Sequence, residues 1–431
     1  MADTPHDEAC FVDSTPKPKL DLLAQLPTEL ALRILHLLSL ITQDQPSHLL
    51  NCRLVSSTWN TLLQDNLLWR NAFFSNPNYR LSSTSNNNNW YSLFRDRFIL
   101  DKRWTQGHQT SHKLKGHSDS VYCLQMHHHQ IITGSVSKQH CHTHIKDRTI
   151  KIWDTTTREC QRTLRGHNGS VLCVRFDQQV LVSGSSDSTV FVWDKANWTV
   201  VQELRGHRSG VLDLALSPTA YVSCSKDTTI KVWSRPDGLL LRTITGHQGP
   251  VNALDLSTLP LSTLLSHPDS SPSNNNTSLA LLSASGDSTM KLWELNTGAL
   301  IRTFDGHLRG LACLKLVEPT RQVITGSNDE TIKIWNLING QCLRTLLGHS
   351  ALVRSLDFSI PQNRLVSGSY DKTIKVWDLT TGQLLLDFRK GADRNLVFDV
   401  KFNLTTIVSV GHPNSIMLLD FADGLDAHQF I

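Results

Sequence analysis

The sequence predicts an all-β, seven-bladed propeller that follows a small all-α region. Three observations support this fold class. A Gly-His pair and a tryptophan recur along most of the chain with a period of about 40 residues. The segments between them alternate apolar and polar residues and are separated by turn residues, which is typical of short antiparallel strands. Before residue 107 the apolar spacing becomes that of helices.

The repeat is complete in six copies. Their Gly-His histidines are His117, His167, His207, His247, His307 and His349, and their closing tryptophans are Trp153, Trp193, Trp233, Trp293, Trp335 and Trp377. Each copy predicts the short strands of one propeller blade. A seventh copy, residues 397–421, keeps the strand pattern but has Gly391-Ala392, Pro413 and Leu419 in place of the Gly-His pair, the turn aspartate and the tryptophan. We expect this copy to be the least stable blade.

The seventh blade needs a further strand. Residues 109–114 precede the first Gly-His pair just as residues 160–164 precede the second. We expect this N-terminal strand to complete the last blade, because ring closure removes exposed sheet edges. The alternative is that residues 425–431 supply the strand. Two copies carry insertions, between Ser135 and Asp147 and from Ser257 to Ser278, which we expect to be mobile loops.

These signatures resemble those of the WD-repeat family. The resemblance implies a buried tetrad in each blade, in which aspartate accepts from histidine, and the other ring nitrogen meets a hydroxyl that also contacts the tryptophan indole. The matching sets are His117, Thr133, Asp147, Trp153; His167, Ser183, Asp187, Trp193; His207, Ser223, Asp227, Trp233; His247, Ser283, Asp287, Trp293; His307, Thr325, Asp329, Trp335; and His349, Ser367, Asp371, Trp377. A hydrolytic Ser-His-Asp site is disfavoured, because catalysis does not need six copies at one register.

The composition disfavours several other classes of protein. The 431 residues suffice for two or three domains, and a net charge of +4 does not suggest a nucleic-acid-binding face. No apolar stretch reaches the roughly 20 residues of a membrane span. Nine cysteines without a Cys-x-x-Cys pair, and a polar start, indicate a reduced protein of the cytoplasm and/or nucleus.

Histidine clusters raise the question of a metal site. One is His127-His128-His129, and the other contains His140, Cys141, His142 and His144. We favour exposed loop histidines over a zinc site, because a strand separates the clusters and places them on opposite rims. We therefore expect no metal and no cofactor.

The helical region has its own signature. It contains Leu26-Pro27, with Thr28 as an expected N-cap of the helix that follows, then a Cys52-Arg53-Leu54-Val55-Ser56 segment and Leu68-Trp69. This resembles the F-box, and residues 90–104 resemble the linker helix of F-box/WD proteins. The expected domains are a disordered N-terminus at 1–20, the F-box at 21–70, a helical linker at 71–106 and the propeller at 107–431.

The resemblance to F-box/WD-repeat proteins implies a function. It is that of the substrate-recognition subunit of a Skp–cullin–F-box E3 ubiquitin ligase, which is not itself an enzyme. A Skp-type adaptor, and through it cullin and RING subunits, would be the partners, together with a protein substrate carrying a short degron. The adaptor-binding candidates are Leu26, Pro27, Leu30, Ile34, Leu54 and Val55. Burial of these residues within the module itself is an equal alternative.

The substrate is expected to bind the top face of the ring. In this family two positions per blade point there, the residue before the turn aspartate and the second residue of the first strand. The candidates are Tyr122, Lys146, Lys226, Asn328, Arg354, Tyr370 and Phe398. This mixture suits a peptide with apolar and acidic character, and dependence on phosphorylation stays open. The alternative function is a WD-repeat scaffold that assembles a complex without degradation.

Overall fold

The computed structural model describes residues 21–41, 47–76, 78–81, 89–127, 130–136, 147–265, 278–389, 395–427, 429 and 430. The predicted disordered segment 1–20 lies outside this part of the chain. The described residues form two compact units. The helical unit comprises the residues up to Asp101 together with those from Leu425 onward, and the propeller comprises Lys102–Gly424. These units differ from the expected domains, which assigned the last residues to the propeller.

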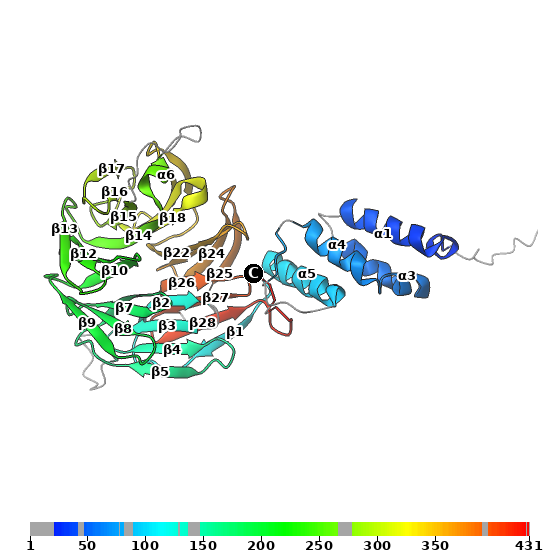
Figure 1. Ribbon diagram of the computed structural model, residues 1–431, viewed down its shortest axis with the longest axis horizontal. Coiled ribbons are helices and arrows are strands. Elements are labelled where there is room, and N and C mark those ends of the chain that lie inside the picture. Colours follow the sequence, from blue (N-terminus) through cyan, green and yellow to red (C-terminus); the bar gives the residue numbers. More distant parts are fainter. Residues whose placement is uncertain are drawn as a thin grey trace, which may run out of the picture. The chain divides into compact units, whose positions relative to one another are not determined.

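The propeller consists of seven antiparallel sheets, each of four strands (Figure 1). Blade 1 contains β2 (Val121–His127), β3 (Gln130–Ser135), β4 (Ile150–Asp154) and β5 (Cys160–Leu164); blade 2 contains β6 (Val171–Phe176), β7 (Val180–Ser185), β8 (Thr189–Asp194) and β9 (Val200–Arg205); blade 3 contains β10 (Val211–Leu216), β11 (Ala220–Ser225), β12 (Ile230–Ser234) and β13 (Leu240–Ile244); blade 4 contains β14 (Val251–Pro260), β15 (Leu279–Ser285), β16 (Met290–Glu294) and β17 (Leu300–Phe304).

The remaining blades continue the same order. Blade 5 contains β18 (Leu311–Val317), β19 (Gln322–Ser327), β20 (Ile332–Asn336) and β21 (Cys342–Leu346), with the 3₁₀ turn η3 (Glu318–Thr320) after β18; blade 6 contains β22 (Val353–Ser359), β23 (Arg364–Ser369), β24 (Thr373–Asp378) and β25 (Leu384–Arg389); blade 7 contains β26 (Val397–Phe402), β27 (Thr406–Gly411), β28 (Ser415–Asp420) and β1 (Thr110–Leu114). The predicted all-β, seven-bladed fold is therefore confirmed.

The ring is closed by the N-terminal strand. Strand β1 pairs with β28 from Thr110, opposite Asp420, to Leu114, opposite Ile416. The first strands of the blades contact one another in the closed cycle β2, β6, β10, β14, β18, β22, β26 and back to β2. The predicted closing strand is confirmed, and the alternative, in which residues 425–431 supply it, is wrong.

The core lies between successive blades. Trp193 of blade 2, for example, packs with Cys123, Ile132 and Ile150 of blade 1 and is 3 % exposed. Each tryptophan that closes a complete repeat is buried in this way. Because each blade covers the apolar face of its neighbour, the repeat has no stable edge until the ring closes.

The blade 4 insertion begins as ordered structure, so the expectation of a loop is wrong for its first part. Strand β14 continues to Pro260 and is followed by the helix α6 (Leu261–Leu265). Leu261 and Leu264 are buried in an apolar cluster with blade 5, because three-residue spacing puts both on one helical face. Residues 266–277, and the blade 1 insertion at 137–146, lie outside the described residues.

The described residues of the helical unit form seven helical elements. They are η1 (Leu23–Gln25), α1 (Thr28–Ile41), α2 (Ser47–Asn51), η2 (Cys52–Leu54), α3 (Ser57–Leu62), α4 (Asn66–Ser75) and α5 (Trp90–Gln106), of which α5 ends within the propeller residues (Figure 1). Leu35, Trp69 and Phe73 are fully buried, and the Trp69 indole donates a hydrogen bond to the Leu63 carbonyl.

The start of α1 differs from the expectation by one residue. Thr28 is the first helical residue, and the Pro27 carbonyl accepts from the amides of Leu30 and Ala31. Thr28 is therefore not the N-cap. Upstream, the Asp21 carboxylate accepts from the Ser56 hydroxyl at 2.6 Å and from the Trp59 indole at 2.8 Å. These bonds tie the beginning of the unit to its middle.

Candidate recognition surfaces

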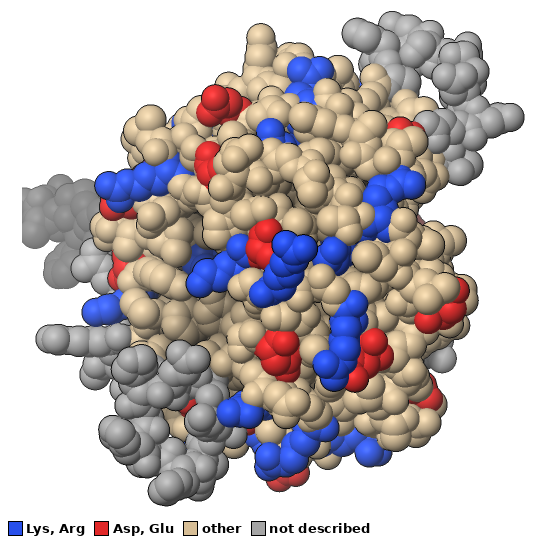
Figure 2. Space-filling model, turned by 90° about the vertical axis from the view of Figure 1, so that its left-hand side faces the viewer, with Lys and Arg blue, Asp and Glu red and all other residues tan. Residues whose placement is uncertain are grey.

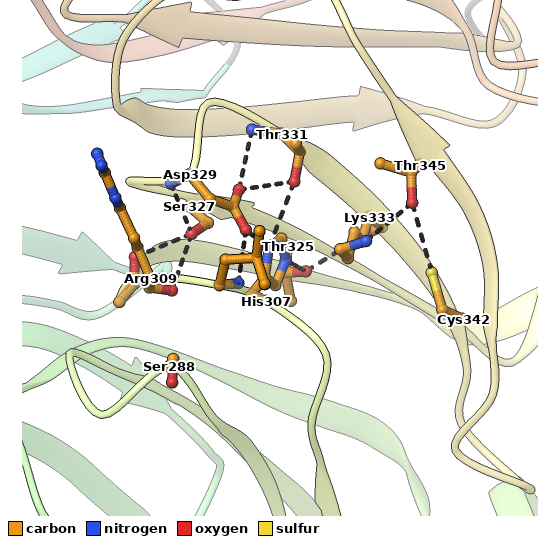
Figure 3. A network of polar contacts seen from close by, with 12 residues as sticks. Ser288, His307, Arg309, Thr325, Ser327, Asp329, Thr331, Lys333, Cys342 and Thr345 are labelled. Carbon is orange, nitrogen blue, oxygen red and sulfur yellow. Dashed lines mark hydrogen bonds and ion pairs between the residues drawn. The ribbon is translucent and has the colours of Figure 1, made fainter.

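The predicted tetrads are present in all six complete blades. In blade 5, shown in Figure 3, His307 Nδ1 lies 2.8 Å from Asp329, and its Nε2 lies 2.8 Å from the Thr325 hydroxyl. The Trp335 indole donates to the same hydroxyl at 2.8 Å. The six tetrad hydroxyls are fully buried, so no substrate can reach them. The tetrads therefore have a structural role.

A fifth member of the network was missed from the sequence. Thr331, two residues after the turn aspartate, donates its amide and hydroxyl to Asp329 at 3.0 and 2.7 Å. The recurring Asp-x-Thr spacing could have revealed it. Burial alone would raise the pKa of Asp329, but the hydrogen bonds from Thr331 and His307 outweigh it and hold the pKa at about 2. Asp227 and Asp287 also have a pKa of about 2 for the same reason.

The tetrads predict that acid weakens the propeller. Burial lowers the pKa of His207, His247 and His307 below 6.5, although the paired carboxylates oppose it. The contribution of these histidines to stability is complete above pH 6.5. It falls below that pH, because the histidines of the unfolded chain take up protons before those of the folded chain. The stabilisation that Asp227, Asp287 and Asp329 contribute is lost in turn as the pH falls from 3.8 to about 2. Urea midpoints that are constant, or that rise, from about pH 7 to about pH 4 would contradict this.

The seventh blade, which lacks the tetrad, provides a second test of how much the tetrads contribute to stability. Ser409 occupies the position of the tetrad hydroxyl, but its buried Oγ has no hydrogen-bond partner among the described residues. We expect Ser409→Ala to leave stability unchanged or to raise it slightly, because it removes an unsatisfied group. Ser367→Ala, the matched change in blade 6, should cost about 1–3 kcal/mol, because His349 and Trp377 lose a shared partner. Equal shifts in urea midpoint for the two variants would refute the comparison.

A bulge places one candidate position of every blade. In all seven first strands the pairing register shifts at the second residue, as it does at Tyr122, Arg354 and Phe398. A bulge re-aims the side chain of the extra residue. The second-residue side chains of all seven blades line one central cavity of about 60 Å³. This volume is well below the roughly 150 Å³ of a cavity that holds benzene, so a ligand larger than a few waters must lie on the face.

Four of the seven predicted substrate-binding residues come together on three adjacent blades. The Phe398 ring lies 5.2 Å from that of Tyr122 and 5.6 Å from that of Tyr370. The Arg354 guanidinium lies 5.0 Å from the Tyr122 ring centroid and donates to the Ala312 carbonyl at 3.2 Å. We call these four residues the aromatic cluster.

The Arg354 charge lacks a carboxylate partner. Two other cations near the central cavity have one, since Arg175 meets Asp213 at 2.9 Å and Lys401 meets Asp357 at 3.5 Å. Within the described part of the chain, no carboxylate lies within 4 Å of the Arg354 guanidinium. Burial would lower the pKa of Arg354, but the nearby tyrosine hydroxyls outweigh it and raise the pKa. A partly desolvated cation without a counter-ion favours an anionic ligand.

The ring and cation contacts that define the cluster do not include Lys226 or Asn328. Lys226 and Asn328 are exposed in turns of blades 3 and 5, and Lys146 lies outside the described residues. Sequence reasoning missed Leu308, which follows the blade 5 Gly-His pair and is 90 % exposed. Its neighbour Arg309 is also exposed, and its side chain points away from the polar network in Figure 3.

Charge is mixed on the side of the propeller that carries β9 and β13. Figure 2 shows Lys and Arg scattered among Asp and Glu on a surface that is mostly uncharged. This side offers no continuous basic patch of the kind that binds nucleic acid. Among the described residues, no group of histidine, cysteine and acidic side chains could hold a metal ion, and His128, His129 and the 140–144 cluster lie outside them. No described helix is long and apolar enough to cross a membrane.

The helical unit leaves its adaptor-binding candidates exposed. The exposed fractions are 37 % for Leu26, 49 % for Leu30, 39 % for Ile34, 85 % for Leu54 and 60 % for Val55, and Pro27 is exposed as well. Burial within the unit, the alternative, is therefore wrong. Leu22, Leu37, Leu67 and Phe74 are exposed too and were missed. Leu37 could have been found, because it continues the helical spacing of Leu30 and Ile34 on α1.

Comparison with known proteins identifies both units. The family model described as WD domain, G-beta repeat matches residues 108–154, 158–194, 198–234, 238–294, 298–336 and 340–378. The model described as F-box-like matches residues 23–75. The repeat model stops before β26, so it does not include the degenerate seventh blade that the structure shows.

The names of two of three curated relatives combine an F-box with WD repeats. F-box/WD repeat-containing protein 7 of Drosophila melanogaster is 29 % identical over 170 residues, covering 36 % of this chain and 12 % of the relative. An F-box/WD repeat-containing protein A-like protein of Dictyostelium discoideum is 31 % identical over 115 residues, covering 27 % and 9 %. A probable E3 ubiquitin ligase complex SCF subunit sconB of Penicillium rubens is 40 % identical over 75 residues, covering 17 % and 10 %.

The similarity thus spans 12 % or less of the length of these relatives. The repeat model, by contrast, covers more than half of the 431 residues. The chain therefore belongs to the WD-repeat family and carries an F-box-like domain before its repeats.

Proposed function

We propose that this chain is the substrate-recognition subunit of a Skp–cullin–F-box E3 ubiquitin ligase. The F-box-like domain binds a Skp-type adaptor and through it the cullin and RING subunits, and the top face of the propeller binds target proteins. The chain itself is not an enzyme, since ubiquitin transfer takes place on other subunits.

The exposed apolar surface of the helical unit carries this proposal. Three exposed apolar side chains of α1, Leu30, Ile34 and Leu37, lie on one helical face. Leu54 and Val55 are exposed at and just after η2. A monomer rarely leaves so many large apolar side chains in water on a small module, so a partner is expected to cover them. The ligase subunit named among the relatives supports an SCF adaptor as that partner.

The aromatic cluster supports the second half of the proposal. Arg354 offers a cation without a carboxylate beside the Tyr122 ring, and Phe398 contacts the rings of both Tyr122 and Tyr370. The substrate class that fits is a peptide in which an acidic or phosphorylated residue stands beside apolar ones. Lys226 and Asn328 would make peripheral contacts.

Affinity capture tests the assignment. The intact chain is expected to recover the adaptor and a cullin, and the double variant Pro27→Ala, Leu30→Ala should recover at least tenfold less, because it removes apolar contact area at the interface. Since both side chains are exposed, the fold should be unaffected. Leu343→Ala makes the same kind of change at a 44 % exposed leucine of β21 and should recover normal amounts. An intact chain that never brings down a cullin would refute the ligase function.

A further inference from the structure

The last residues of the chain fold into the helical unit. The Phe430 amide donates to the Ala427 carbonyl at 3.3 Å, which closes a turn. The Asp426 amide donates to the Asp96 carboxylate of α5 at 3.4 Å. Ala427 and Phe430 are only 8 % exposed, so both belong to the core of the helical unit.

Phe430 occupies a slot built from three parts of the unit. Its ring stacks on Phe73 of α4, with 6.3 Å between centroids and 23° between planes. The Arg97 guanidinium of α5 lies 5.9 Å from its centroid. Leu81, from the segment between these helices, forms a β-bridge with Phe430, and the Tyr79 ring closes the slot 5.2 Å from Phe73.

Arg97 makes the slot dependent on its occupant. The residue is 4 % exposed and meets Asp101 at 3.3 Å through one nitrogen. Its Nε and Nη1 have no hydrogen-bond partner among the described residues. The guanidinium instead lies between two rings, 4.9 Å from Tyr79 and 5.9 Å from Phe430. Aromatic faces attract a desolvated cation, so the loss of either ring leaves it poorly compensated.

We propose that this slot is a peptide-binding site and that its ligand is the chain's own C-terminal segment, residues 425–430. The segment acts as a latch that completes the core of the helical unit. Helix α4 contacts the latch through Phe73 and also contacts α1, which carries the exposed apolar surface. The integrity of that surface therefore depends on residues at the opposite end of the sequence. This inference does not rest on the ligase function.

Limited proteolysis of the full-length chain and of two variants tests the latch. A chain that ends at Gly424 and the variant Phe430→Ala should both be cleaved within the helical unit at least tenfold faster, because cleavage follows the population of the opened form. Phe74→Ala removes a 54 % exposed ring from the same helix and should change the rate less than threefold. Cleavage of both variants at the rate of the intact chain would overturn the latch.

Hydrogen exchange of the unmodified chain gives a test that needs no variant. The Asp426 and Phe430 amides should exchange at the rate of the α4 amides, since all belong to one cooperative unit. Exchange of both at the rate of an unfolded peptide would overturn the proposal. In the proteolysis assay, a synthetic peptide of residues 424–431 should slow cleavage of the truncated chain. An equal effect of the same peptide with Phe430→Ala would show that the slot does not select its occupant.

Discussion

Replacement of Asp371 by alanine is expected to lower the free energy of unfolding of the propeller by about 3–5 kcal/mol, because each buried donor left without an acceptor costs about 1–3 kcal/mol. The carboxylate is 5 % exposed and accepts from His349 at 2.7 Å, from the Ser350 amide at 3.1 Å and from the amide and hydroxyl of Thr373 at 2.9 and 2.6 Å. Its removal leaves these donors in the blade without an acceptor.

Urea unfolding followed by tryptophan fluorescence measures this loss. Asp305→Ala is the matched control, because Asp305 is exposed and stands beside a Gly-His pair without belonging to a tetrad. Its midpoint should stay close to that of the parent chain. A loss of less than about 1 kcal/mol for Asp371→Ala would mean that the tetrads contribute little to the propeller.

Replacement of Arg354 by alanine is expected to reduce the capture of substrate proteins by about 30-fold or more, since truncating one partner of a desolvated charge pair costs about 2–5 kcal/mol. Arg354→Lys should not restore capture, because an ammonium cannot reproduce the planar fork or its contact with the Tyr122 ring. Lys226→Ala should reduce capture only a fewfold, because that lysine is exposed.

Quantitative mass spectrometry of proteins captured from cells provides the measurement. Arg344→Ala removes an exposed arginine from the outer strand β21 and controls for the loss of one positive charge. Since Arg354 also donates to the Ala312 carbonyl of the neighbouring blade, the melting temperature of the Arg354→Ala chain is compared with that of the parent. If a folded Arg354→Ala chain captures the same proteins in the same amounts, the aromatic cluster is not the substrate site.

The fold was largely predictable, because motif residues mark the turns and the strand ends of each complete repeat. Gly-His, the turn aspartate and the tryptophan recur at fixed spacing, and each has a local physical role that the sequence pattern reveals. The hydrogen bonds of Thr331 and its equivalents to the turn aspartates were harder to predict, since a threonine in a turn has many possible roles. The ordered start of the blade 4 insertion was hidden by its Ser/Asn/Pro-rich remainder, although Leu261 and Leu264 already had helical spacing.

The surfaces were predictable in part. The resemblance to the WD-repeat family supplied Tyr122, Arg354, Tyr370 and Phe398 as candidates, but only the structure shows that these four lie together. Leu308 was missed because an apolar residue in a short loop gives no periodic signal. The packing of Phe430 against Phe73 joins residues more than 350 positions apart, and no local pattern encodes a contact of that kind.

The pairing of β1 with β28 also has a consequence for synthesis. Thr110 lies opposite Asp420, 310 residues later in the chain. A ribosome must therefore translate about 300 residues after β1 before that strand meets its partner. The helical unit waits longer still, because Phe430, which packs on Phe73, follows β28 in the sequence. A product that ends before β28 therefore has neither a closed ring nor the Phe430 contact of the helical unit.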